Sequence, residues 1–239
     1  MELHVALTPD SLLYWFGWAL SLFIIVSPIW LGRNLSIQGR RAFERAWAIL
    51  LMISLVIMTY MSVNRGEFTW GGSLPIHMCG ISRLLIIGYF LLGKKWMGEL
   101  VTFTGIAGGL QSLLTPEFTH GINPVYVFDY YMNHASIIAV GLYIIYVHQQ
   151  PLQKWAWLRN FGRIQLMAVF AVAVNLLTGG NYMYLMEPPI VDNPLVIRSE
   201  SFPYMHVVFF ELFAALNFLL IEVVLRRIRV RNSIGVRVV

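Results

Sequence analysis

The stretch SLLYWFGWALSLFIIVSPIWL, residues 11–31, contains no charged side chain and is almost wholly apolar. Its length matches the ~20 residues that an α-helix needs to cross the hydrocarbon core of a bilayer. The preceding residues, MELHVALTPD, include no Lys or Arg, so they lack the basic start of a cleaved secretion signal. We therefore expect residues 11–31 to form a retained transmembrane helix.

Similar apolar runs, separated by polar segments, recur along the whole chain. They predict further helices near 46–63, 74–93, 96–115, 128–148, 158–178 and 203–225. Apolar residues make up 58% of the chain and charged residues 12%, about half the charged fraction of an average soluble domain. The sequence thus predicts an all-α fold, a polytopic membrane helix bundle of about seven transmembrane helices. We expect a single domain over residues 1–239 of a multi-pass protein of the cell membrane.

The basic residues predict the orientation of the bundle, because cytoplasmic loops carry the excess of Lys and Arg. Fourteen of the 17 fall in alternate connections and the tail. They are Arg33, Arg40, Arg41, Arg45, Lys94, Lys95, Lys154, Arg159, Arg163, Arg226, Arg227, Arg229, Arg231 and Arg237. This segregation requires an odd number of spans, with the N-terminus outside and the C-terminus inside. The net charge of +5 therefore indicates membrane anchoring, and we expect no nucleic-acid partner.

Two long connections, 116–134 and 179–203, are expected on the outer side and are rich in turn formers and aromatic residues. Long loops in compact proteins are usually functional or disordered. The aromatic residues favour order, and two interpretations remain open. They form an aromatic belt at the lipid headgroups, or they line a substrate site.

Cys79 and His134 are each expected near the outer end of a helix, at similar depths. A thiol and an imidazole at one level can form a nucleophile–base pair, in which the imidazole holds the thiol as thiolate. The alternative is that Cys79 is a small buried apolar residue and that His134 only contacts headgroups. His77 lies about 200° around an ideal helix from Cys79, so it is a poor partner for the thiol.

Ionisable side chains inside a bilayer are costly and mark functional sites by default. Arg83 is expected near the middle of its helix, and Glu211 lies at a comparable depth in the last helix. We expect these two to form an ion pair. Gln111 and Asn175 are further polar side chains that can reach an intramembrane cavity, whereas Gly105 and Gly109 have the spacing that lets two helices approach closely.

Three segments resemble a known family: LPIHMCGISR (74–83), YYMNHAS (130–136) and GGNYMYL (179–185). They are similar to the YwaF family of bacterial integral membrane proteins, which has a distant animal relative, transmembrane protein 164. The resemblance implies a lipid acyltransferase that moves acyl chains between phospholipids, with Cys79 as nucleophile and His134 as base. The reaction also needs a donor for the oxyanion, either backbone N–H groups near the start of the helix that carries Cys79 or Asn133, and the resemblance implies Asn181 and Tyr182 as pocket residues.

Three functions therefore remain open at the level of the sequence. The first is an acyltransferase, transacylase or lipase with membrane phospholipids as partners, using Cys79 and His134. The second is a transporter or ligand-binding protein with a polar cavity, and the third is an assembly partner of another membrane protein. Substrate-pocket candidates are His77, Arg83, Gln111, Asn133, Asn181, Tyr182 and Glu211. The chain has no Walker-type loop, no HExxH motif and a single Cys, so we expect no cofactor and no metal; nothing identifies a protein partner.

Overall fold

A computed structural model describes residues 5–118, 121–189 and 196–235 of the chain, and side-chain environments up to residue 228. The described residues are mainly helical, with one short pair of strands. The helices are α1 (Leu12–Asn34), α2 (Ile37–Asn64), α3 (Met78–Leu92), α4 (Lys95–Thr104), α5 (Leu110–Leu114), α6 (Pro124–Tyr146), α7 (Ala156–Thr178) and α8 (Met205–Gly235). A π-helical turn, η1 (Gly105–Gly109), joins α4 to α5, and a short 3-10 turn, η2 (Tyr182–Tyr184), follows α7. The predicted all-α bundle is therefore confirmed.

Local capping explains where the helices begin. The Ser11 side chain accepts from the Leu13 N–H at the start of α1, and Ser36 does the same for Gly39 at the start of α2. Because of the second cap, α2 begins nine residues before the expected Ala46. Arg40, Arg41 and Arg45 consequently lie on its first turns and not in a loop.

The helix around His134 also begins earlier than expected, at Pro124 and not near Phe128. The Asn123 side chain caps it by accepting from the Val125 N–H, and proline occupies the first turn, where its missing N–H leaves no bond unmade. In contrast, α3 starts four residues late, at Met78, with His77 as the residue before it. These shifts place Cys79 in the first turn of α3 and His134 in the middle of α6, not near its outer end.

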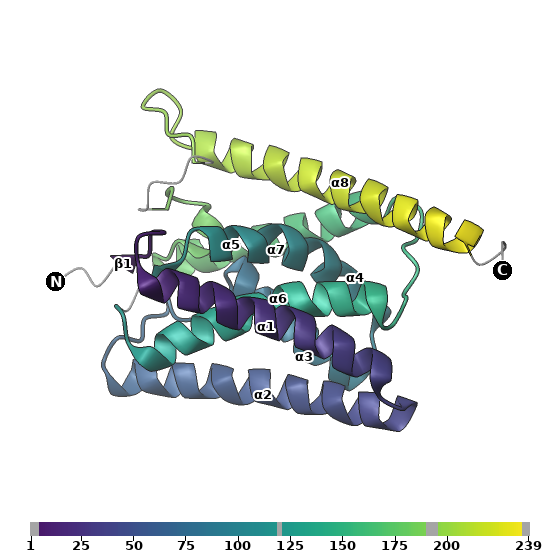
Figure 1. The fold of residues 1–239 in the computed structure, drawn as a ribbon. Coiled ribbons are helices and arrows are strands. Elements are labelled where there is room, and N and C mark those ends of the chain that lie inside the picture. Colours follow the sequence, from purple (N-terminus) through teal and green to yellow (C-terminus); the bar gives the residue numbers. More distant parts are fainter. Residues whose placement is uncertain (1–4, 119–120, 190–195, 236–239) are drawn as a thin grey trace.

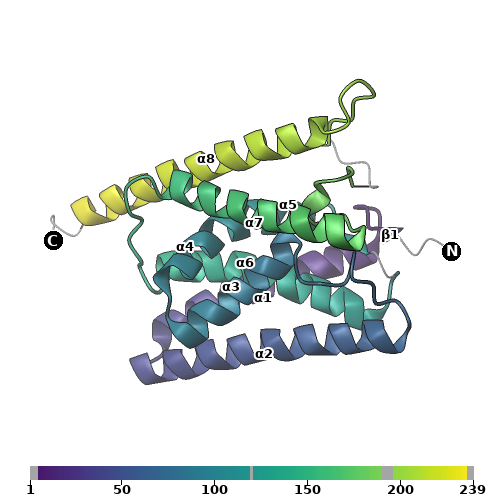
Figure 2. The same cartoon turned by 180° about the vertical axis from the view of Figure 1, so that it is seen from behind.

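Helix α6 occupies the centre of the bundle, with α2 along one side of the molecule and α8 along the opposite side (Figures 1 and 2). It packs against α1, α2, α3, α4, η1 and α5, whereas α8 packs mainly on α7. Two short strands, β1 (Val5–Ala6) and β2 (Glu117–Phe118), pair in antiparallel orientation. They join the segment before α1 to the segment before α6. The register pairs Val5 with Phe118 and Ala6 with Glu117.

Four helices are long and apolar enough to cross a membrane: Leu12–Asn34, Ile37–Asn64, Ala156–Thr178 and Met205–Ile228. All four lie on the outside of the bundle and expose large apolar side chains such as Phe23 (68%) and Leu177 (86%). Such surfaces suit lipid and would be a liability in water. Helix α6 carries polar residues because its neighbours shield it from lipid. The count of seven spans and the orientation stay predictions.

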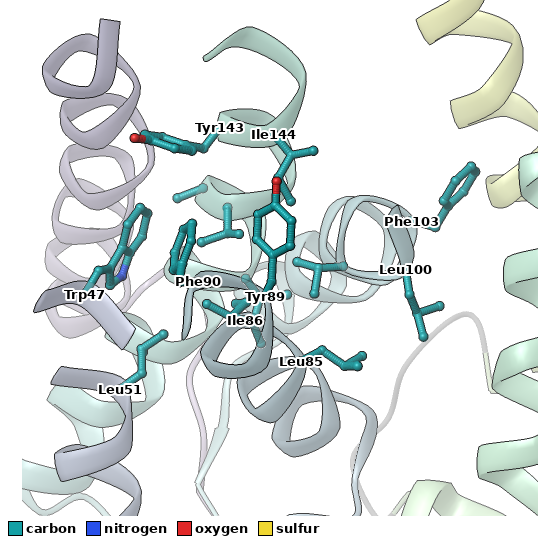
Figure 3. Packing of buried hydrophobic residues seen from close by; sticks show 14 of the residues in the cluster. Trp47, Leu51, Leu85, Ile86, Tyr89, Phe90, Leu100, Phe103, Tyr143 and Ile144 are labelled. Atoms are coloured by element: carbon teal, nitrogen blue, oxygen red, sulfur yellow. The ribbon is translucent and has the colours of Figure 1, made fainter. Parts of the chain in front are cut away.

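Aromatic and aliphatic side chains fill the end of the bundle that is expected to face the cytoplasm. Trp47 of α2, Phe90 of α3 and Tyr143 of α6 have ring centroids about 6 Å apart (Figure 3). The buried Glu44 beside them accepts hydrogen bonds from the Tyr143 hydroxyl and from His148 Nε2. This end is thus a packed core with a satisfied carboxylate, and the polar residues named as site candidates lie elsewhere.

Candidate functional site

Cys79 is the second residue of α3, and its side chain is only partly exposed. The connection before it is held in place by Tyr182, which is fully buried. The Tyr182 hydroxyl accepts from the Leu74 N–H and donates to the Trp70 carbonyl. The start of α3 is therefore anchored to the segment that follows α7.

Arg83, one turn deeper in α3, forms its ion pair with Asp129 of α6 and not with Glu211. Its Nη2 lies 2.9 Å from both carboxylate oxygens of Asp129, and its Nε donates to Asn133 Oδ1 at 2.7 Å. Ser54 of α2 donates to the same carboxylate. The expected Arg83–Glu211 pair is wrong because α3 packs on α6, where Asp129 lies one turn before Asn133, and not on α8, which carries Glu211.

Glu211 instead accepts a hydrogen bond from Gln165 of α7, at 2.6 Å. Gln111 donates to the Thr115 hydroxyl within its own helix. Asn175 exchanges two hydrogen bonds with the backbone of Tyr182. The polar groups named as one cavity thus take separate partners.

His134 is buried, and its hydrogen bond fixes which ring nitrogen carries the proton. Its Nδ1 lies 2.8 Å from the carbonyl oxygen of Tyr130, one turn earlier in α6. Because a carbonyl can only accept, Nδ1 donates, and in the neutral imidazole the lone pair belongs to Nε2. His134 thus has the tautomer and the fixed orientation that a general base needs.

Tyr130 stands beside both members of the expected pair. Its ring lies 4.2 Å from the His134 ring, and its hydroxyl, within electrostatic range of Cys79, donates to the Ser112 carbonyl. Arg83 and Asp129 are within electrostatic range of both Cys79 and His134. Among the described residues, no hydrogen bond joins the Cys79 thiol to the His134 imidazole. The two groups have the neighbours Arg83 and Asp129 in common.

The remaining candidates hold the loops around Cys79. His77 Nδ1 accepts from the Met183 N–H at 3.2 Å, and its ring packs on Tyr182 and Tyr184. The Asn181 side chain accepts from the backbone of Met186 and Glu187 and donates to the Glu187 carbonyl. Asn181 and Tyr182 therefore shape the segment after α7 that contacts His77 and the connection before α3. Across the described part of the chain, no three His, Cys, Asp or Glu residues are placed to hold a metal.

Asp129 and Tyr130 are the two site residues that the sequence reasoning missed. Both fall where the expected connection 116–134 overlaps the expected helix 128–148, so no partner was expected for Asp129, and for Tyr130 an aromatic belt and a substrate site both stayed open. The signal that would have found them is the pair Asn123–Pro124, a cap followed by a first-turn proline. Starting the helix there puts Asp129 four residues before Asn133, on the face that meets Arg83.

One comparison with known proteins gives a match. The model of a family described as the TMEM164 family matches residues 6–222. No curated protein and no solved structure matches the chain. The match supports the relation to transmembrane protein 164 that the motifs indicated, whereas the resemblance to the YwaF family stays a prediction.

Proposed function

The chain belongs to the TMEM164 family, and on that premise we propose that this membrane protein is a phospholipid acyltransferase or transacylase with Cys79 as nucleophile and His134 as base. The observation that carries the proposal is the His134 tautomer. The Tyr130 carbonyl holds the proton on Nδ1, so the lone pair of Nε2 remains for a thiol or a hydroxyl. Cys79 is the only thiol of the chain and stands in the same neighbourhood.

The proposed reaction has two halves. In the first, Nε2 of His134 takes the proton of Cys79, and the sulfur attacks the ester carbonyl carbon of a donor phospholipid. The C–S bond forms, the ester C–O bond breaks, and the proton passes from the imidazolium to the departing lysophospholipid alkoxide. In the second, Nε2 takes the proton of an acceptor hydroxyl, whose oxygen attacks the thioester carbonyl carbon. The new C–O bond forms, the C–S bond breaks, and the imidazolium returns the proton to the departing Cys79 thiolate.

Asn133 is suited to stabilise the oxyanion of the tetrahedral intermediate. Arg83 Nε donates to its Oδ1, which fixes the orientation of the amide. The amide nitrogen, with two N–H donors, then faces away from Arg83. A donor that is oriented before the reaction stabilises developing charge without reorganising. The Arg83–Asp129 pair thus acts as a support for Asn133.

Because no hydrogen bond joins Cys79 to His134, the proposed reaction requires that substrate binding bring the thiol and the imidazole closer together. Catalytic hydrogen bonds are often long in unliganded enzymes and tighten when substrate binds. A lipid acyl chain that enters beside the partly exposed Cys79 would have to bring thiol and imidazole together. Since Cys79 lies in the first turn of α3, at the end that is expected to face outward, the donor we propose is a membrane phospholipid and not cytosolic acyl-CoA.

The alternative of a transporter has weaker support. It required Arg83, Glu211, Gln111 and Asn175 to share one polar cavity. Each of these side chains is hydrogen-bonded to a different neighbour. These four side chains therefore take separate partners, which weakens the case for one shared polar cavity.

Lipid profiling of membranes that contain wild-type or variant protein tests the proposal. Cys79→Ser keeps the size of the side chain, and His134→Asn keeps an N–H near the Tyr130 carbonyl while removing Nε2. Both variants should lose the same changes in phospholipid acyl composition. The matched control, His148→Asn at the other end of the bundle, should retain them. Profiles that stay like wild type in either active-site variant would refute the assignment.

A further inference from the structure

Basic side chains gather where the first two turns of α7 approach α4, at the end of the bundle that is expected to face the cytoplasm. Arg159 and Arg163 of α7 share one buried carboxylate, that of Glu99 in α4. Arg159 Nη2 lies 2.8 Å from Glu99 Oε1, and Arg163 Nη1 lies 3.5 Å from the same oxygen. Two positive charges therefore meet one negative charge, which leaves one positive charge in surplus.

Asn160, which is fully buried, fixes one edge of the Arg163 guanidinium. Its Oδ1 accepts from Arg163 Nη1 at 2.7 Å, and its amide nitrogen donates to Glu99 Oε1 at 2.9 Å. Among the described residues, Nε and Nη2 of Arg163 make no hydrogen bond. These two nitrogens form the edge of the planar fork that matches two oxygens of a phosphate group. Arg163 is thus held through one edge, and its other edge can donate to an oxyanion.

The surroundings of Arg163 are those of a membrane interface. Its guanidinium contacts Asn160, which is three residues nearer to the start of α7, so the side chain is directed toward the end of the helix. The ring of Trp96 in α4 covers the guanidinium, with 5.7 Å between Cζ and the ring centroid, and Trp96 is itself exposed. Exposed tryptophans of membrane proteins gather at the level of the lipid headgroups. The cluster is therefore expected at the depth where lipid phosphates lie.

Helix α7 continues from the two arginines as an open apolar surface. On an ideal helix, Leu166 and Phe170 lie within about 60° of Arg159 and Arg163. Leu166 is 74% exposed and Phe170 is 59% exposed. Between the two arginines along the chain, Gly162 has nothing within 4 Å of the position that a Cβ would take. Positive charge followed by open apolar surface is the arrangement that complements an anionic headgroup with its acyl chain.

The bias of basic residues toward the cytoplasm does not account for this arrangement. That bias depends on how many Lys and Arg a loop carries and not on their order around a carboxylate. Arg41, an exposed residue of α2 with no ion pair in the described part of the chain, is a charge of that simpler kind. In contrast, the exposed Lys95 precedes Glu99 by four residues, so it lies on the side of α4 that faces the two arginines. Lys95 raises the local surplus to two positive charges.

We propose that Arg159, Arg163 and Lys95 bind the headgroup of an anionic phospholipid from the cytoplasmic leaflet, with one acyl chain along Leu166 and Phe170. The lipid phosphate accepts two parallel hydrogen bonds from Nε and Nη2 of Arg163. The surplus charge selects a headgroup with a net negative charge, as basic pockets between membrane helices do on the cytoplasmic side. The site lies at the opposite end of α7 from the segment that anchors the connection before Cys79, so it does not rest on the proposed acyl transfer.

Lipid binding to the full-length protein in neutral detergent, measured by native mass spectrometry, tests the site. The two probes are dioleoylphosphatidylglycerol and dioleoylphosphatidylcholine, which share their acyl chains and phosphate and differ in net charge. The measured quantity is the preference, the ratio of the two dissociation constants for the first bound lipid. Wild type should prefer phosphatidylglycerol about 25-fold, which is roughly fivefold for each of the two surplus charges. Equal affinities for the two lipids would overturn the site.

Arg163→Gln should reduce the preference about fivefold, because it removes one surplus charge and the free edge of the fork. Glu99 keeps its bonds to Arg159 and Asn160 in this variant, so the contact between α4 and α7 is retained. Lys95→Gln, at an exposed position that the fold does not depend on, should also reduce the preference about fivefold. The matched control Arg41→Gln removes the same charge from the same end of the bundle and should keep the wild-type preference. A wild-type preference in Lys95→Gln, or an equal loss in Arg41→Gln, would contradict the site.

Two further measurements separate this site from other sources of binding. Cys79→Ser should keep the wild-type preference, whereas its loss would place the bound lipid at the proposed nucleophile and overturn the site on α7. Free sn-glycerol 3-phosphate, at the concentration of the lipid, should not displace phosphatidylglycerol. Displacement would show that a phosphate is bound without its acyl chains and would contradict the assignment to a lipid.

Discussion

The ion pair between Arg83 and Asp129 gives the sharpest prediction for stability. The Arg83 side chain is 4% exposed and that of Asp129 is 16% exposed, and the pair joins α3 to α6 at 2.9 Å. Arg83→Leu leaves the carboxylate of Asp129 with only the Ser54 hydroxyl, which cannot balance its charge. Removing one partner of a buried pair costs about 3–5 kcal/mol, whereas replacing both by apolar residues is often close to neutral.

We therefore expect Arg83→Leu to lower the free energy of unfolding by about 4 kcal/mol. The double variant Arg83→Leu, Asp129→Leu should lose only about 1 kcal/mol, mainly because Asn133 keeps an acceptor without its donor. The assay is unfolding in mixed micelles followed by circular dichroism, applied to both single variants and the double variant.

A control cycle pairs Arg83→Leu with Glu211→Leu. Since Glu211 bonds to Gln165 and not to Arg83, these two losses should add to within about 0.5 kcal/mol. Additive losses for Arg83 with Asp129, or a coupling between Arg83 and Glu211, would refute the pairing and with it the support proposed for Asn133.

Two further predictions concern the packing of α6 and the connection before α3. Gly105→Ala should lower stability by about 1–3 kcal/mol, because its Cβ would lie 2.4 Å from the Ile137 carbonyl oxygen, while Gly108→Ala, which meets nothing within 4 Å, should be neutral in the same unfolding assay. Tyr182→Phe should lower the melting temperature and speed proteolysis before α3 by removing two hydrogen bonds worth about 1 kcal/mol each; an unchanged digestion rate would count against the anchor.

The overall architecture was predictable because lipid imposes a strong pattern. Apolar runs such as residues 11–31 must be helical in a bilayer, where each backbone polar group needs an internal partner. The close approach at Gly105 and Gly109 also followed from spacing, and both glycines pack against α6. Cys79 and His134 could also be identified from the sequence, because they are reactive side chains within apolar stretches.

The partners of the polar residues were less predictable. Depth along a helix suggested Glu211 for Arg83, but depth does not say which helices are neighbours, and α3 packs on α6. The segment around Asp129 has a mixed composition because α6 is shielded by other helices, so hydropathy placed its start too late.

The most direct test of the proposed function is the mass of the intact protein after incubation with a donor phospholipid and no acceptor. We predict that Cys79 gains one fatty acyl group through a thioester, which hydroxylamine removes. His134→Asn should prevent this modification although Cys79 is present, and Cys79→Ser should lack the hydroxylamine-sensitive product. A folded wild-type protein that stays unacylated, or one whose acylation persists in His134→Asn, would contradict the proposed nucleophile and base.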